Sequence, residues 1–208
     1  LAEACLRAMP DILTGKVKAT DVMFPNSSME LVEGIYKGNL LSDLFHDVLG
    51  ETLVSYIQES LSQDGSSQFR ILEIGAGTGG STDGLLSKLR PFQDHIREYC
   101  YTDLSKAFLL HARENYVSRA PYLTTRIFDV EKPIAEQNIQ ADRYDVVIAA
   151  NVLHATRNIR QTLRNVKASM RKGGVLLLNE LSGKSQFAHL TFGLLEGWWL
   201  YEDTGLRI

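Results

Sequence analysis

The fold is decided by the stretch Ile71-Leu72-Glu73-Ile74-Gly75-Ala76-Gly77-Thr78-Gly79-Gly80. An apolar run with one acidic residue predicts a buried strand, and the glycines behind it predict a tight turn into a helix. The exposed amide groups at the start of such a helix favour the polar or anionic parts of a nucleotide-like ligand. The stretch therefore predicts a strand, a cofactor-binding turn and a helix.

The glycine spacing fits two cofactor patterns. Gly75, Gly77 and Gly80 satisfy G-x-G-x-x-G, the pattern of dinucleotide-binding turns. Gly75, Gly77 and Gly79 satisfy G-x-G-x-G. With Glu73 two residues ahead, this second pattern resembles the first motif of S-adenosylmethionine-dependent methyltransferases. A glycine-rich loop that binds nothing is disfavoured, because closely spaced glycines weaken a fold unless their backbone conformation is needed.

Composition narrows the class of protein. The chain has 208 residues, of which 44% are hydrophobic, enough for one substantial core and a small appendage. Its formal net charge of −3 indicates no footprint for nucleic acid or for an anionic membrane, and no apolar run reaches transmembrane length. Cys5 and Cys100 lack metal-ligand spacing, so no metal site is expected, and they fit a reducing cytoplasm.

Residues 1–65 differ from the rest of the chain in their pattern of apolar residues. Between Leu41 and Leu61 apolar residues recur at helical spacing, with Ser42 as a candidate N-cap. No strand-like run precedes residue 66. The chain is therefore predicted to have two units, a helical N-terminal segment at 1–65 and a core at 66–208.

From residue 66 onward, strands and helices alternate. Strands are predicted at Phe69–Ile74, Arg97–Thr102, Leu123–Phe128, Tyr144–Ala150 and Val175–Asn179, and helices at Ser81–Leu89, Leu104–Tyr116 and Ile159–Met170. Arg171-Lys172-Gly173-Gly174 is expected to stop the last helix. This alternation predicts an α/β fold with a doubly wound, Rossmann-like parallel sheet and right-handed crossovers.

Ligands of such sheets bind beyond the carboxyl ends of the strands, where two aspartates are found. Asp103 ends the second strand, and a carboxylate there can accept both ribose hydroxyls of a bound nucleoside. Capping of the next helix is the less favoured alternative. Asp129 follows the third strand and can accept from an adenine amino group or simply form an Asx turn. For Asp129 the two interpretations are equally supported.

A histidine and a glutamate follow the fourth and fifth strands. His154 closes the segment Asn151-Val152-Leu153-His154, and Glu180 comes directly after Asn179. A His that donates one ring proton to a carboxylate is held in one tautomer and can take a proton from a substrate. The alternative is a His at a strand end and a solvated Glu. Because both residues fall at the mouth of the sheet, the dyad is favoured.

The remaining histidines are predicted to lie outside any site. His46, His95, His111 and His189 lack a comparable context and are interpreted as surface or packing residues. The segment Trp198-Trp199-Leu200-Tyr201 either walls a substrate pocket or belongs to the core. We favour the core, because aromatic clusters are more often buried there.

Several segments together resemble one family. Asn151-Val152-Leu153-His154-Ala155-Thr156 and Gly193-Leu194-Leu195-Glu196-Gly197-Trp198-Trp199 are far more specific than the glycine turn. They are joined by Phe24-Pro25-Asn26-Ser27-Ser28, Tyr101-Thr102-Asp103 and Leu177-Leu178-Asn179-Glu180. These segments resemble the carbon-methylating methyltransferase domains embedded in modular polyketide synthases. The resemblance covers nearly the whole chain.

The resemblance implies a class I methyltransferase that uses S-adenosylmethionine, releases S-adenosylhomocysteine and needs no metal. His154 and Glu180 are then the expected catalytic base. The expected cofactor-binding residues are Glu73, Gly75, Gly77, Gly79, Asp103, Asp129 and Asn151. Residues 1–65 resemble the lid that closes over the site in these domains, and Tyr36 of this segment could reach the substrate.

The implied substrate is a β-ketoacyl thioester on an acyl carrier protein, beside neighbouring synthase domains in the same polypeptide. The α-carbon between ketone and thioester is acidic enough for a well-placed His to deprotonate. The enolate then attacks the methyl group of S-adenosylmethionine. A cytoplasmic protein without nucleic-acid or membrane partners is expected.

Three alternatives stay open. Methylation of a β-hydroxyl oxygen uses the same fold and cofactor, and the lid-like segment favours carbon over oxygen. An NAD-dependent oxidoreductase would show a hydride-transfer constellation, which the sequence lacks. A non-catalytic spacer of a synthase would have lost the base or the glycine turn, and both are present.

The ends of the sequence predict a piece of a longer polypeptide. The chain begins at Leu1 without an initiator Met and stops at Ile208. Class I methyltransferases usually finish with a helix and an antiparallel strand pair after the fifth strand. Too few residues follow Trp199 to supply that pair, so the core is expected to be incomplete at its C-terminal side.

Overall fold

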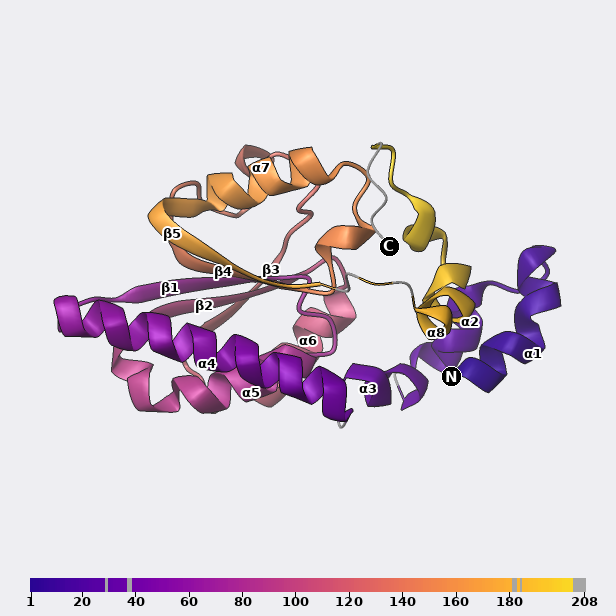
Figure 1. Cartoon of the computed structure of the whole chain (residues 1–208), viewed down its shortest axis with the longest axis horizontal. Coiled ribbons are helices and arrows are strands. Elements are labelled where there is room, and N and C mark those ends of the chain that lie inside the picture. The colour runs from indigo at the N-terminus through magenta and orange to yellow at the C-terminus, as the bar shows by residue number, and fades with distance from the viewer. Residues whose placement is uncertain (29, 37–38, 181–182, 184, 204–208) are drawn as a thin grey trace.

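The computed structural model describes residues 1–28, 30–36, 39–180, 183 and 185–203. Five parallel strands form one sheet in the order β3-β2-β1-β4-β5 (Figure 1). The strands are β1 (Phe69–Ile74), β2 (Ile96–Asp103), β3 (Leu123–Ile127), β4 (Tyr144–Ala150) and β5 (Met170–Asn179). This confirms the predicted α/β fold with a doubly wound parallel sheet.

Helices cover both faces of the sheet. They are α1 (Ala2–Leu13), α2 (Ala19–Met23), α3 (Glu30–Tyr36), α4 (Leu40–Gln63), α5 (Gly80–Leu89), α6 (Lys106–Tyr116), α7 (Ile159–Ser169) and α8 (Gln186–Leu190). Short 3-10 turns lie at Pro25–Ser27, Arg90–His95, Ile134–Glu136, Leu153–Ala155, Phe192–Leu194 and Glu196–Trp199. In Figure 1, α4, α5 and α6 lie on one face of the sheet and α7 lies on the other.

The central strands are apolar on both sides because helices cover both faces. Along β1 the side chains alternate, so that Ile71 packs in the cluster under α4 and α5, while Leu72 packs in the cluster on the α7 side. Val146 and Val147 of β4 divide in the same way. The period of two residues along a strand thus builds two separate cores from one continuous apolar run.

The long helix α4 begins at Leu40, and its N-cap residue differs from the predicted one. Asn39, not Ser42, is the N-cap, and its side chain accepts from the amides of Leu41 and Ser42. The Ser42 hydroxyl instead donates to the carbonyl of Ile35, which joins α4 to α3. The backbone of Asn39 is extended, as an N-cap residue requires, so its side-chain oxygen can accept from the first backbone N–H groups of the helix.

The predicted glycine stop at 171–174 is wrong. Met170 pairs with Tyr144, and a register shift separates that pair from Val146 and Val175, so the residues between them form an irregularity inside β5. Gly173 has a φ of +78°, a backbone conformation that favours glycine. These glycines therefore allow a bulge in an edge strand, where the sequence pattern suggested a helix end.

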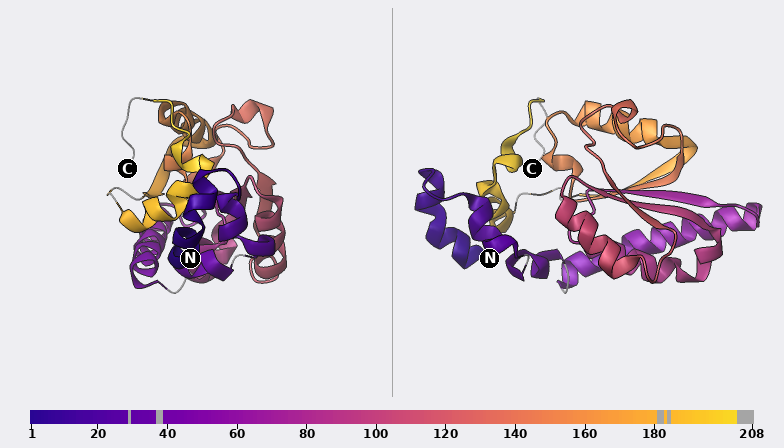
Figure 2. Two further views of the ribbon diagram at one scale, coloured as in Figure 1. Left: turned by 90° about the vertical axis from the view of Figure 1, so that its right-hand side faces the viewer. Right: turned by 180° about the vertical axis from the view of Figure 1, so that it is seen from behind.

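The N-terminal helices pack against the segment around α8, beyond the carboxyl edge of the sheet. Figure 2 shows the N-terminal helices beside α8, and the contacts between α1 and α8 agree. Buried Cys5, Met23 and Val32 form a small core with Phe192 and neighbouring apolar residues. This cluster positions the N-terminal segment over the edge at which ligands of parallel sheets bind.

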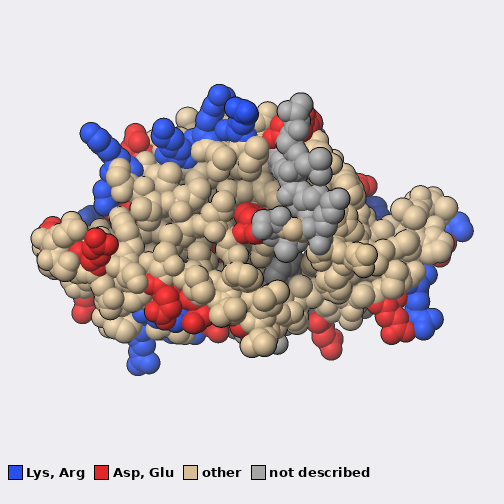
Figure 3. Space-filling view, in the orientation of Figure 1, with Lys and Arg blue, Asp and Glu red and all other residues tan. Residues whose placement is uncertain are grey.

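The described helices carry both charged and apolar side chains on the surface. None of the described helices combines the length and the apolar character required to cross one. Figure 3 shows Lys and Arg side chains along the edge formed by α7, where Arg160, Arg164 and Lys167 are exposed. Helix α4 exposes Leu44, Phe45 and Val48 and buries another stripe of its apolar residues.

Candidate active site

The glycine turn follows the G-x-G-x-G pattern. Gly75, Gly77 and Gly79 have φ values of +60°, +60° and +78°, which favour glycine, whereas Gly80 is simply the first residue of α5. The end of β2 holds the turn in place. The amide of Gly77 donates to Asp103 at 3.0 Å, and the hydroxyl of Tyr101 donates to the carbonyl of Gly77 at 2.6 Å.

Glu73 lies beneath the glycine turn and lines no cavity described below. Its side chain accepts hydrogen bonds from the hydroxyls of Tyr99 and Thr82, each at 2.7 Å, and it is 2% exposed. Burial raises the pKa of the Glu73 carboxyl to about 7, while these two hydrogen bonds oppose the rise. Glu73 therefore ties β1 to β2 and to the first turn of α5, and it positions the turn from below.

Replacement of Glu73 by glutamine is expected to flatten the dependence of stability on pH. The folded-state pKa lies above the ordinary value of 4.5, so folding is most favoured below pH 4.5 and loses stability as the pH rises through about 7. The loss is on the order of 3 kcal/mol, and a neutral amide avoids it. Urea denaturation of both proteins at pH 5 and pH 8 measures this difference. Equal pH dependence in the two proteins would contradict the prediction.

Three cavities meet at the carboxyl edge of the sheet, and each is named after residues that line it. The turn cavity, of about 260 Å³, is lined by Phe24, Val32, His46, Gly75–Thr78, Gly80, Ser81, Phe108, Ala150, Asn151, Phe192 and Leu195. The aspartate cavity, of about 210 Å³, is lined by Ile74, Gly75, Asp103, Leu104, Phe128–Glu131, Asn151, Val152, Ala155 and Thr156. The dyad cavity, of about 570 Å³, is lined by Gly34, Ile35, Asn39, Leu41, Ser42, Asn151, His154, Ala155, Ser185, Phe187, Ala188, Phe192, Leu195, Gly197 and Trp198.

Asn151 lines all three cavities. It follows β4 with a φ of +54°, and its amide donates to the carbonyl of Asn179 at 2.7 Å. Positive φ is uncommon for a residue other than glycine and is found most often for Asn and Asp. The end of β5 thus fixes the backbone of Asn151 at the point where the cavities join.

The aspartate cavity brings both predicted aspartates together. Asp103 accepts from the amides of Gly77 and Ser105, so it braces the turn as well as the start of α6. Burial raises the pKa of Asp103, and those amide donors oppose the rise. Asp129 accepts from the amide of Glu131 and pairs with Lys132 at 3.0 Å. Each side chain therefore has a local structural role and also lines the same cavity.

His154 and Glu180 form a hydrogen-bonded pair. Nδ1 of His154 lies 2.5 Å from Oε2 of Glu180, and both side chains are about 15% exposed. The other carboxylate oxygen accepts from the amides of Val152 and Leu153, at 3.0 and 2.7 Å. Three donors thus fix the carboxylate, and a proton on Nδ1 leaves the imidazole lone pair on Nε2. This arrangement holds His154 in the tautomer that a general base requires.

An aromatic group packs against the dyad. The ring of Trp198 lies edge-on to His154, with 5.7 Å between the ring centroids, and is stacked on Phe192. Trp199 is 55% exposed, and its indole donates to the carbonyl of Gly193. Our preference for a core role of this segment is wrong, because Trp198 forms a wall of the dyad cavity. The sequence pattern gave no sign of which side of the ring faces the cavity.

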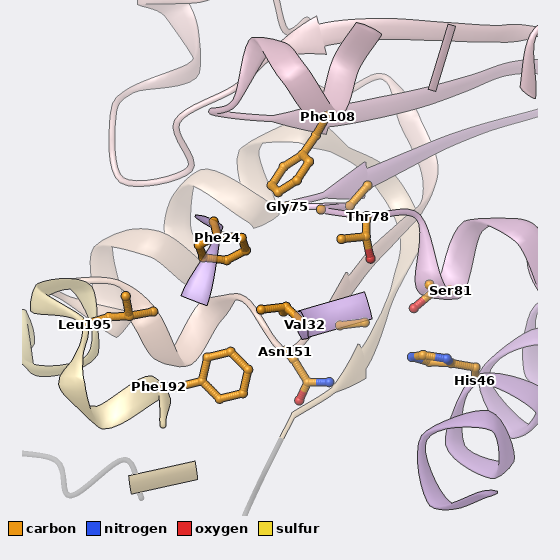
Figure 4. Close-up of a pocket in the computed structure, with 14 residues that line it drawn as sticks. Phe24, Val32, His46, Gly75, Thr78, Ser81, Phe108, Asn151, Phe192 and Leu195 are labelled. Carbon is orange, nitrogen blue, oxygen red and sulfur yellow. The ribbon is translucent and has the colours of Figure 1, made fainter. Parts of the chain in front are cut away.

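His46 and Tyr36 belong to the N-terminal helices. The sequence pattern predicts a surface or packing role for His46, but His46 lines the turn cavity opposite the glycine turn (Figure 4). No strand end precedes His46, so the pattern used for the other candidates does not find it. Tyr36 closes α3, and its side chain lies outside the described part of the structure.

The residues of the turn and aspartate cavities fit S-adenosylmethionine. A Cβ atom added at Gly75 would lie 2.3 Å from Cγ2 of Val152, so only glycine fits there. A Cβ atom added at Gly77 would lie 3.8 Å from its nearest neighbour, the carbonyl oxygen of Gly75. The open turn offers amides, and the two aspartates offer acceptors for ribose hydroxyls and for an amino group. Among the described residues, no cluster of His, Cys, Asp and Glu suited to a metal ion is found.

This sheet order, with a glycine turn and carboxylates at one edge, defines the class of Rossmann-like nucleotide-binding domains. Residues 72–176 match the family model described as a methyltransferase domain. The chain belongs to this family, as a methyltransferase domain of the kind found in polyketide synthases.

The proteins similar to this chain are longer polypeptides. Polyketide synthase PksM of Bacillus subtilis (strain 168) is 65% identical over 208 residues, which are 100% of this chain and 5% of the synthase. The DszA carbon methyltransferase superposes with a TM-score of 0.91 at 41% identity, over 97% of this chain and 52% of that chain. The trans-methyltransferase CalH, solved in complex with S-adenosylhomocysteine, superposes with a TM-score of 0.73 at 32% identity, over 95% of this chain and 52% of that chain. This chain therefore spans about half of the solved chains and a small part of the synthase.

Proposed function

We propose that this domain transfers a methyl group to the α-carbon of a β-ketoacyl thioester carried by an acyl carrier protein. The single observation that carries the proposal is the His154–Glu180 pair in a cavity that joins the cofactor site at Asn151. The cofactor is S-adenosylmethionine, in agreement with the methyltransferase family and with the S-adenosylhomocysteine bound to CalH. When bound, it supplies an electrophilic methyl group on a positively charged sulfur.

His154 acts first, as the general base. Its Nε2 takes the proton from the α-carbon, and the electron pair of the broken C–H bond passes into the enolate. Glu180 stabilises the imidazolium that forms, and the amides of Val152 and Leu153 keep the carboxylate in place. The enolate carbon then forms a bond to the methyl group, and S-adenosylhomocysteine leaves. The dyad cavity has a largely apolar lining, which suits an acyl chain.

The N-terminal segment has a role in this proposal. We propose that residues 1–65 act as a lid on the core at 66–208, because Ile35, Leu41 and Ser42 line the dyad cavity. Tyr36 stays a candidate substrate contact. The neighbouring domains of a synthase would deliver the carrier protein, since the similar PksM is far longer than this chain. A reducing cytoplasm suits the buried free thiols of Cys5 and Cys100.

A pair of matched acyl thioesters tests whether the α-carbon or the β-oxygen of the substrate is methylated. The protein is incubated with S-adenosylmethionine and either a β-ketoacyl or a β-hydroxyacyl pantetheine thioester of the same chain length, and tandem mass spectrometry locates the new methyl group. We expect methylation at the α-carbon of the keto substrate only, because a neighbouring ketone is needed to make that proton acidic. A methyl group on the oxygen of the hydroxy substrate would establish O-methylation instead. Binding of S-adenosylhomocysteine without any transfer would favour a spacer domain.

A further inference from the structure

The turn cavity contains a histidine that the proposed chemistry does not use. His46 lies on α4, and Figure 4 shows its ring directed into the cavity beside Ser81 and toward Asn151. The side chain is half-buried. Within the described part of the chain, its ring nitrogens make no hydrogen bond. A polar ring directed into a ligand cavity without a hydrogen-bond partner indicates that a ligand supplies one.

The position of the aspartates decides which part of the cofactor reaches His46. Asp103 and Asp129 line the aspartate cavity and provide acceptors for the ribose and adenine ends. The turn cavity lies on the other side of Gly75 and Asn151, which line both cavities. The amino-acid end of S-adenosylmethionine, with its carboxylate and its ammonium group, is the part left for the turn cavity.

A charged end group needs polar partners in this cavity. Much of the lining is aromatic or aliphatic, including Phe24, Val32 and Phe108, and none of the described lining residues is Lys, Arg, Asp or Glu. His46 is the one histidine among the described lining residues, and burial lowers the pKa of its imidazole while the nearby Asp43 opposes the fall. Apart from backbone amides of the turn, the other described lining side chains that can donate a hydrogen bond are Thr78, Ser81 and Asn151. A carboxylate without such donors would be costly to bury.

We propose that the imidazole of His46 binds the amino-acid end of S-adenosylmethionine and so positions the methyl group. The proposal rests on the cofactor and not on which atom of the substrate is methylated. Helix α4 then contacts both ligands, because Ser42, one turn before His46, lines the dyad cavity. Helix α4 is in this way a wall of the cofactor site as well as a cover of the substrate.

Two ligands that differ only at this end test the proposal. S-adenosylhomocysteine carries the amino-acid end, and 5′-methylthioadenosine lacks it. Titration calorimetry is expected to show that His46→Ala binds S-adenosylhomocysteine at least about tenfold more weakly, as loss of a charge-assisted hydrogen bond implies, while its affinity for 5′-methylthioadenosine changes less than about twofold. His46→Gln, which keeps a side-chain donor, is expected to recover part of the loss. Phe45→Ala, an exposed neighbour on the same helix, is expected to bind both ligands like the wild-type protein.

Equal losses for the two ligands in His46→Ala would overturn the proposal, because they would indicate a general role of α4 in folding. Unchanged affinity for S-adenosylhomocysteine would overturn it as well. A wild-type protein that binds neither ligand would contradict the cofactor assignment itself, and His46 would lose its proposed role with it.

Discussion

His154→Ala is expected to abolish methyl transfer to carbon while the affinity for S-adenosylhomocysteine stays within about twofold of the wild-type value. A positioned general base contributes roughly 10²–10⁴-fold to the rate, and alanine at this position leaves no group to take the α-proton. His154 lines the dyad cavity and neither of the two cavities that fit the cofactor, so binding of the cofactor does not depend on it. Initial rates with a β-ketoacyl thioester and calorimetric titration of S-adenosylhomocysteine measure the two effects separately.

A substitution of Glu180 tests the role of the carboxylate that hydrogen-bonds to His154. Glu180→Gln keeps the shape of the side chain and an oxygen that accepts from the amides of Val152 and Leu153. Its amide nitrogen then faces Nδ1 of His154 and donates to it, so the imidazole proton lies on Nε2 and the base is lost. It is therefore expected to lower kcat about as much as His154→Ala does, although the imidazole is still present. Exchange of the α-proton with solvent deuterium, followed without cofactor turnover, shows whether deprotonation is the affected step. An alanine variant that still exchanges the proton and methylates at the wild-type rate would exclude His154 as the base.

Gly75→Ala is expected to weaken binding of S-adenosylhomocysteine by at least about tenfold and to reduce methyl transfer further. A side chain at a φ of +60° is strained by roughly 1–2 kcal/mol, and its Cβ would lie 2.3 Å from Val152. Val152 is β-branched and stiff, and its amide binds Glu180, so a shift of Val152 also disturbs the carboxylate that orients His154. One added methyl group therefore affects the cofactor turn and the dyad together.

Gly84→Ala is the matched control for this substitution. Gly84 lies inside α5, has no neighbour within 4 Å of an added Cβ, and has no positive φ. Alanine there is expected to raise the free energy of unfolding by up to about 1 kcal/mol and to leave binding unchanged. Thermal denaturation and the same calorimetric titration compare the two variants. Normal cofactor binding by Gly75→Ala would mean that the glycine turn does not contact the ligand.

The strands and the glycine turn could be predicted from the sequence because their signals are local. Phe69–Ile74 and Tyr144–Ala150 have the bounds that their apolar runs predict, since a central parallel strand is apolar on both faces. The sheet topology then brings the ends of β4 and β5 to the same edge, and this is why His154 and Glu180 meet. The predicted start of β5 at Val175 was wrong, because the strand already begins at Met170 and the basic residues and glycines form a bulge inside it.

The sequence by itself determined the class of fold, the cofactor turn and the set of strand-end side chains at one edge. Only the tertiary structure decided which helix faces meet that edge. Helix α4 is apolar on several sides, so its pattern does not reveal that Leu53 is buried, that Phe45 is exposed or that His46 turns into the cofactor cavity. The same holds for Trp198, whose place beside His154 depends on contacts between segments far apart in the chain. Such orientations follow from packing between elements, and no local pattern of residues encodes them.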